Sequence, residues 1–310
     1  MTAYPDVAGP EVADDPALAA LLDTLRRRYN DRVCGVLLYG SCLRSGDLAE
    51  GILDLYLVLD EYRGAYGRWL PAAANWLLPP NVIYAEQSVR GRTLRAKVAL
   101  LSLRDFQRCC SPRRFESYIW GRFAQPTKIL ASRDPDSRRQ LEAAMLQASR
   151  TLLLRALPAL PAQGPVEALW QGALALSYAT ELRTERKGRS QELADYARDF
   201  YLELTRLHAG AVGLLLDDSG EGTAYRYPAS QFARKRARLA WFGRRVAGKS
   251  LSIARLTKAL FTFEGALDYL AWKLSRHSGE AIVIPDRVRR APLLYIWGFA
   301  WGLWRRGIFR

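Results

Sequence analysis

The chain of 310 residues contains only two histidines and four cysteines, and each shortage argues against a kind of chemistry. With only His208 and His277, histidine-based hydrolysis and a histidine-rich metal site are disfavoured, and we expect both on helix surfaces. The cysteines lack zinc-site spacing, and the adjacent pair Cys109 and Cys110 is a poor disulfide candidate. We therefore expect reduced thiols in a cytoplasmic protein.

Long apolar segments are also scarce. No run reaches the roughly 18 uncharged apolar residues that suggest a bilayer-spanning helix. The nearest is residues 291–304, APLLYIWGFAWGLW, which is too short to span comfortably. The acidic, proline-containing N-terminus has neither the basic nor the apolar region of a signal peptide. We expect neither a spanning helix nor a secretion signal.

Basic residues exceed acidic ones, 46 against 31, which gives a net charge of +15. Residues 1–222 carry 28 basic and 27 acidic side chains, whereas residues 223–310 carry 18 and 4. The excess therefore belongs to the last 88 residues, and the composition changes near the turn at 217–222. A charge this asymmetric indicates an anionic partner for the C-terminal region.

The apolar spacing predicts an α+β fold, with a mixed sheet and flanking helices followed by a mostly helical domain. Residues 17–30 have the spacing of an amphipathic helix. Strand-like apolar runs occupy 33–39 and 52–59, and residues 82–103 contain two more around an Arg-Gly-Arg turn.

Downstream of the sheet, the sequence predicts helices. Residues 137–215 are helical in pattern, interrupted by a proline-rich linker at 156–165, and the chain is helical and basic from Ser230 onward. We expect three regions: a sheet domain at 1–135, a helical domain that completes the site at 136–222, and a basic, aromatic-rich helical region at 223–310.

The strongest chemical motif joins the first two strands. The first ends in Tyr39-Gly40-Ser41, and Asp54 lies within the second. This arrangement resembles the nucleotidyltransferase superfamily: a glycine admits a triphosphate, Ser41 donates a hydrogen bond to it, and Asp54 would hold Mg²⁺. A second strand acid is usual in such sites, and we expect Asp47 of the connecting loop as its substitute. The alternative is that Asp54 is an ordinary carboxylate of a buried strand.

Later segments carry a more specific resemblance. A strand with Lys97 leads into a helix, residues 118–130 read YIWGRFAQPTKIL, and residues 176–183 read LSYATELR. Together they resemble the mitochondrial-type phosphatidate cytidylyltransferases, the translocator-assembly-and-maintenance family, over roughly residues 33–205. The resemblance implies a nucleotidyltransferase fold and the conversion of CTP and phosphatidate into CDP-diacylglycerol. Gln125 departs from a frequent lysine of the family, and Glu181 replaces an aspartate.

Two polyanionic substrates need cations to bring them together, and the motifs offer four. The candidates are Lys97, Arg122, Lys128 and Arg183. Lys97 lies in a buried-looking run, where an unpaired ammonium would be costly, so a phosphate or an ion pair with Asp54 would satisfy it. Arg122 suits bidentate phosphate binding, with a structural salt bridge as the alternative.

The remaining charges near the motifs are harder to assign. Glu181 and Arg183 lie two positions apart, so they would orient separate ligands or remain solvated. Asp105 and Glu116 have the pattern of ordinary helix-face charges.

The C-terminal region alternates cations with aromatics, including Trp241, Trp272 and Trp297. Tryptophan favours the headgroup boundary and arginine pairs with anionic lipid, so we expect an anionic membrane surface as the partner. Nucleic acid and a protein core or oligomer interface are the alternatives, and the apolar 291–304 run argues against nucleic acid.

The sequence thus predicts a Mg²⁺-dependent enzyme bound peripherally to the cytoplasmic face of a membrane. Its substrates would be CTP and phosphatidate, with no nucleic acid partner. The alternatives are a nucleotidyltransferase with another acceptor, such as an RNA end, a small alcohol or a protein, and a non-catalytic nucleotide-binding scaffold on the membrane.

Overall fold

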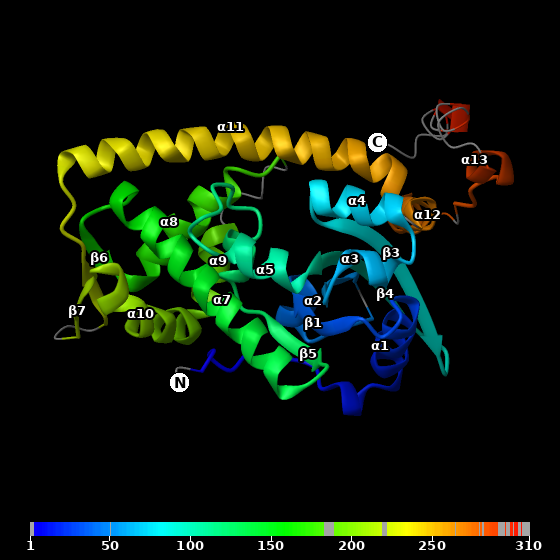
Figure 1. Ribbon diagram of the computed structural model, residues 1–310, viewed down its shortest axis with the longest axis horizontal. Coiled ribbons are helices and arrows are strands. Elements are labelled where there is room, and N and C mark those ends of the chain that lie inside the picture. The colour runs from blue at the N-terminus through cyan, green and yellow to red at the C-terminus, as the bar shows by residue number, and fades with distance from the viewer. Residues whose placement is uncertain are drawn as a thin grey trace.

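The computed structural model describes residues 3–290 apart from 50, 183–188, 219–221, 264, 279 and 281, together with 295, 298–299, 301–302 and 305. A mixed sheet and its helices occupy one half of the molecule and a helical region the other (Figure 1). A single helix, α11 (Gln231–Thr262), runs along one side of both halves. The predicted site residue Arg183 lies outside the described residues.

The larger sheet has five strands in the order β3-β4-β2-β1-β5. Strands β2 and β4 are parallel and the other neighbours are antiparallel, which confirms the mixed sheet expected from the sequence. The last strand was not foreseen. The strands are β1 (Val33–Tyr39), β2 (Leu53–Leu59), β3 (Asn81–Val89), β4 (Arg92–Ser102) and β5 (Lys128–Ser132).

Short helices connect these strands and longer ones follow them. The first part of the chain contains η1 (Val12–Asp14), α1 (Pro16–Arg28), α2 (Ser41–Ser45), α3 (Tyr62–Tyr66), α4 (Trp69–Leu77), α5 (Leu103–Cys110) and α6 (Trp120–Phe123). The second part contains α7 (Pro135–Ala156), η2 (Leu157–Ala159), α8 (Val166–Tyr178), α9 (Arg189–Tyr196), α10 (Arg198–Val212), α12 (Ala266–Ser278) and α13 (Asp286–Arg290). A small antiparallel sheet joins β6 (Gln163–Pro165), β8 (Ala224–Arg226) and β7 (Leu215–Asp217).

One face of the larger sheet packs against α1. Side chains alternate between the two faces of a strand, so Leu53, Leu55 and Leu57 point to this face and meet the buried leucines of α1. The helix begins where the Asp15 side chain accepts hydrogen bonds from the amides of Ala17 and Leu18. This face is closed by apolar packing.

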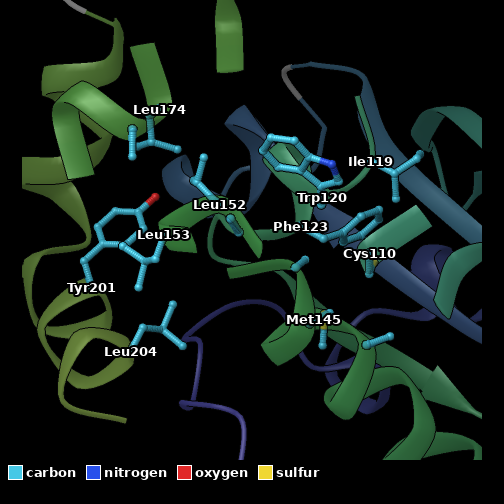
Figure 2. Packing of buried hydrophobic residues seen from close by; sticks show 14 of the residues in the cluster. Cys110, Ile119, Trp120, Phe123, Met145, Leu152, Leu153, Leu174, Tyr201 and Leu204 are labelled. Carbon is cyan, nitrogen blue, oxygen red and sulfur yellow. The ribbon is translucent and has the colours of Figure 1, made fainter. Parts of the chain in front are cut away.

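The other face packs against α5, α6 and α7. The Phe123 ring of α6 lies 4.9 Å from the ring of Tyr56 and 4.7 Å from that of Phe106. The same cluster continues through Trp120, Met145 and Leu152 to Tyr201 of α10 (Figure 2). The sheet and the helical region therefore share one hydrophobic core. Asp54, the second residue of β2, lies on this same face because strand side chains alternate.

Helix α11 is fastened to both halves by polar contacts. Trp241 donates its indole N–H to the carbonyl of Arg155 at 2.9 Å. Arg255 binds the Glu116 carboxylate through both terminal guanidinium nitrogens, with Nη2 at 2.8 Å from Oε2. Glu116 is only 5% exposed, so the expectation of an ordinary helix-face charge is wrong: it is the buried partner of a cation 139 residues away.

Two other surface expectations also fail. Asp105 is buried. Its carboxylate accepts a hydrogen bond from the Tyr62 hydroxyl at 2.8 Å and pairs with Arg108. His208 is buried against Ser149, and burial lowers its pKa to about 4. Among the described residues, no helix is long and apolar enough to cross a membrane.

Candidate active site

A cleft of about 740 Å³ opens between the end of the larger sheet and the inner face of α11. Its floor contains Gly40, Ser41, Asp54 and Lys97, which were predicted from the sequence. Arg122 of α6 and Glu181, which follows α8, line the same cleft. Six of the predicted site residues thus come together from segments up to 141 positions apart.

Strand register places the two central charges side by side. Tyr39 of β1 pairs with Asp54 of β2, and Asp54 pairs with Lys97 of β4. Residues paired across neighbouring strands point to the same face, so these side chains form one row at the cleft floor. Lys97 is exposed to the cleft and not buried, so the desolvation cost expected from its apolar run does not arise.

The backbone of Gly40 passes directly beneath the Asp54 carboxylate. A Cβ atom at position 40 would lie 2.8 Å from Oδ2 of Asp54, and the glycine has φ of +91°. Both features exclude a larger residue, since L residues rarely adopt this φ and the carboxylate occupies the space. The chain then turns into α2, with exposed Ser41 at the lip of the cleft. This geometry keeps the backbone open to a large anion beside Asp54.

The Arg122 side chain is held in place by several polar contacts. Its guanidinium donates to the hydroxyls of Tyr39 and Tyr118 and, at 3.3 Å, to Oε1 of Glu181. Burial opposes the charged form, but the surrounding tyrosines and Glu181 outweigh it and hold the Arg122 pKa well above its usual value. Arg122 is therefore a fixed cation, and it makes the salt bridge that was the alternative to phosphate binding.

The ring of Tyr118 makes cation–π contacts with two guanidinium groups. Cζ of Arg122 is 4.6 Å from the ring centroid and Cζ of Arg255 is 4.3 Å from it. Cation–π contacts of this kind fix the planes of both cations. Each cation also has a carboxylate partner, Glu181 or Glu116. The wall therefore presents two arginines in fixed positions.

Two predicted residues, Lys128 and Asp47, do not line this cleft, and a third cannot be placed. Lys128 pairs with Leu38 in the sheet register, one position from Tyr39, so it lies on the opposite face and donates to Gly9 and Glu11. Asp47 is not among the cleft residues, and its Oδ1 accepts from the amide of Ala49 at 2.8 Å. Arg183 lies outside the described residues.

Several cleft residues were missed by sequence reasoning. Arg44 comes from α2, Tyr118 precedes α6, and Arg255 and Lys258 come from α11. Arg44 lies three residues after Ser41 and could have been suspected from that motif. The α11 residues carried no local signal, because they are two cations among nine on that helix.

The cleft is strongly cationic. Among the described residues, five basic side chains line it against the two carboxylates of Asp54 and Glu181. Phe263 and Tyr269 also line the cleft, and the Tyr269 ring contacts that of Phe263 and that of buried Tyr84. A cleft with this lining suits a ligand that combines several phosphate charges with an apolar or aromatic part.

Magnesium was expected at Asp54 and Asp47. Of these two carboxylates, that of Asp54 lines the cleft and that of Asp47 does not. The described residues contain no group of three or more His, Cys, Asp or Glu side chains placed to hold a metal ion. Magnesium often binds through one or two carboxylates together with substrate phosphates. Asp54, with its carboxylate at the cleft floor beside Gly40, fits an ion of that kind, which arrives with a nucleotide.

Lys258 predicts a pH dependence for anion binding. Burial, helped by nearby Arg255, lowers the Lys258 pKa to about 7, so the cation present at pH 6 is largely lost at pH 8.5. One screened charge contributes ~1 kcal/mol, so affinity for CTP, the nucleotide expected from the sequence, should weaken about fivefold across this range from this group. Lys258→Arg keeps its charge and should lack this component. Calorimetric titration of both proteins isolates it, because CTP ionisation is common to the two; parallel pH profiles would refute the assignment.

Comparison with known proteins adds little to this description. No protein-family model and no curated protein matches the chain. Among solved structures, it is similar to the crystal structure of a nucleotidyltransferase-like protein from Exiguobacterium sibiricum 255-15, with 11% sequence identity. The match covers 93% of this chain and 91% of that one, at a TM-score of 0.27. A likeness this remote supports no assignment of activity to the chain.

Proposed function

We propose that the protein transfers CMP from CTP to phosphatidate, giving CDP-diacylglycerol and pyrophosphate. The observation that carries this proposal is the joining of Gly40, Asp54, Lys97 and Arg122 in one cationic cleft. Together they offer an open backbone, a carboxylate and fixed cations, which are the parts that phosphoryl transfer requires. The choice of CTP and phosphatidate comes from the family resemblance of residues 33–205.

The reaction is a displacement at the α-phosphorus of CTP. A phosphate oxygen of phosphatidate forms the new P–O bond, and the bond to the β-phosphate breaks, so that pyrophosphate leaves with its electron pair. Phosphatidate is already anionic near neutral pH, so no dedicated general base is required. This agrees with the chemistry of the cleft, whose lining includes no histidine among the described residues.

Different side chains of the cleft would bind the two polyanionic substrates and the metal ion. Arg122 and Lys97 would offset the charge on the phosphates, and Arg122 is already fixed by Tyr118 and Glu181. Magnesium, when bound with the nucleotide, would offset charge on the pyrophosphate leaving group. Asp54 would be its protein ligand. Lys128 would contact phosphate only after a conformational change, because it lies on the opposite face of the sheet. Arg183, outside the described residues, remains a proposed phosphate contact on the strength of the family resemblance alone.

We also propose that the protein binds peripherally to an anionic membrane through residues 223–310. Helix α11 carries nine basic and no acidic residues, and it forms one wall of the cleft. Each basic residue close to an anionic leaflet contributes ~1 kcal/mol. The lipid substrate lies at the same boundary, so membrane binding would bring it to the cleft.

The acceptor is the least constrained part of the proposal, and pyrophosphate release tests it. Purified protein with Mg²⁺ and CTP is offered vesicles containing phosphatidate, vesicles containing phosphatidylserine, glycerol 3-phosphate, or a short RNA. We expect release only with phosphatidate. Release with RNA or glycerol 3-phosphate would replace the acceptor, and no release from a protein that binds CTP would favour a scaffold.

A further inference from the structure

Helix α4 of the sheet domain exposes an apolar face that the cleft does not use. Trp69, Leu70, Trp76 and Leu77 are 75%, 60%, 69% and 77% exposed. At 3.6 residues per turn they lie within an arc of about 120°. The helix WLPAAANWL contains no charged residue. A surface of this kind marks an interaction site.

The buried side of α4 fixes the direction of that face. Asn75 donates to the carbonyl of Leu100 on β4 at 3.0 Å and accepts from the amide of Asn81 on β3 at 2.7 Å. Both bonds are buried, and Ala72 on the same side is also buried. The tryptophans are therefore held away from the sheet.

Helix α11 exposes a second apolar stripe, mixed with cations. Six of the seven exposed large apolar side chains of this helix lie within an arc of about 100°. They are Phe232, Leu239, Phe242, Val246, Ile253 and Phe261. Exposed Lys235, Arg238, Arg245 and Lys249 lie within or beside the stripe. This is the pattern of a helix that lies in a lipid interface.

The two faces are connected at the end of α4. Lys258 donates to the carbonyls of Leu78 and Pro80, and Nε of Arg255 donates to that of Pro79 at 3.0 Å. The three carbonyls follow α4 directly, so its end is attached to the last turns of α11, as Figure 1 shows. Leu256, which is exposed and also lines the cleft, lies between these contacts.

We infer that α4 and the outer stripe of α11 form one docking surface for a bilayer that contains anionic lipid, and that this surface sets the cleft mouth at headgroup depth. The inference rests on the proposed function for its membrane partner, and it assigns a lipid contact to the sheet domain itself. Tryptophan at the headgroup level and cations against anionic lipid are the expected contacts. A second copy would bring like charge against like charge, and nucleic acid would leave the apolar side chains in water.

Vesicle sedimentation of the full chain tests the surface. Vesicles of phosphatidylcholine with phosphatidate are compared for the wild type and Trp69→Ala/Trp76→Ala. We expect the double variant to partition about tenfold more weakly, because two interfacial tryptophans are lost. The matched control is Tyr196→Ala/Leu215→Ala, which removes two exposed apolar side chains from α9 and β7 and should partition as the wild type does.

The outcomes separate this inference from the proposed activity. Equal partition of the wild type and the tryptophan variant would overturn it, as would a change in oligomeric state in place of vesicle binding. Leu77→Glu changes the most exposed of the four α4 side chains and is a second test of the surface. It should also weaken binding to phosphatidate vesicles. If the wild type makes no CDP-diacylglycerol but loses vesicle binding on tryptophan replacement, the inference stands and the proposed activity fails.

Discussion

Asp54→Asn is expected to lower CDP-diacylglycerol formation by at least about a thousandfold. The amide keeps the shape of the side chain but removes the negative charge at the cleft floor beside Gly40, where the proposal places the metal-bound nucleotide. Binding of CTP without divalent metal should be unchanged or tighter, because a negative charge near the phosphates is gone. Steady-state turnover and calorimetric titration together measure both effects.

Asp47→Asn is the matched control for this result. It is the same chemical change within the same loop-and-strand unit, but Asp47 is exposed and is not among the cleft residues. Turnover should stay within about twofold of the wild type, as for most surface substitutions. A large loss in Asp47→Asn would restore it as the second metal ligand. Full activity in Asp54→Asn would refute the assignment of that carboxylate.

Arg122→Gln is expected to reduce turnover by about a hundredfold or more. The variant removes a fixed cation from the cleft and also leaves Glu181 without its partner at 3.3 Å. Some loss of thermal stability should accompany it, since an isolated, largely buried carboxylate is unfavourable. Activity and melting temperature therefore both fall, and neither alone identifies the role of Arg122.

The double variant Arg122→Gln/Glu181→Gln separates the two roles. A neutral amide pair removes the unpaired charge, so the melting temperature should recover in part. If Arg122 binds phosphate, turnover and CTP affinity should remain low. If the arginine serves only as a salt-bridge partner, both should return to near wild-type values, and phosphate binding by Arg122 would be refuted.

The sequence predicted the parts of the fold that depend on local patterns. The helix before β1, the apolar strands β1 and β2 and the β3–β4 hairpin at Arg90 and Gly91 are confirmed. The juxtaposition of Gly40 and Asp54 was also predictable, because neighbouring antiparallel strands bring the end of β1 to the start of β2. These features depend on neighbours in the chain.

The predictions that were wrong or missing concern residues whose contacts lie far away in the chain. Whether Lys128 faces the cleft depends on the register of β5 against β1, which a shift of one residue would reverse. Glu116 looked like a surface charge because its partner, Arg255, is 139 residues later. The inner face of α11 became a cleft wall only through tertiary contacts, so Lys258 carried no signal before the fold was known.

The most direct test of the proposed function follows the α-phosphate of CTP. Protein, Mg²⁺ and phosphatidate vesicles are incubated with CTP labelled at that position, and the lipid and aqueous phases are then separated. We expect the label in the lipid phase as CDP-diacylglycerol, in equal amount to the pyrophosphate released, and none with Asp54→Asn. Label that stays in the aqueous phase, although the wild type binds both CTP and the vesicles, would contradict the proposal.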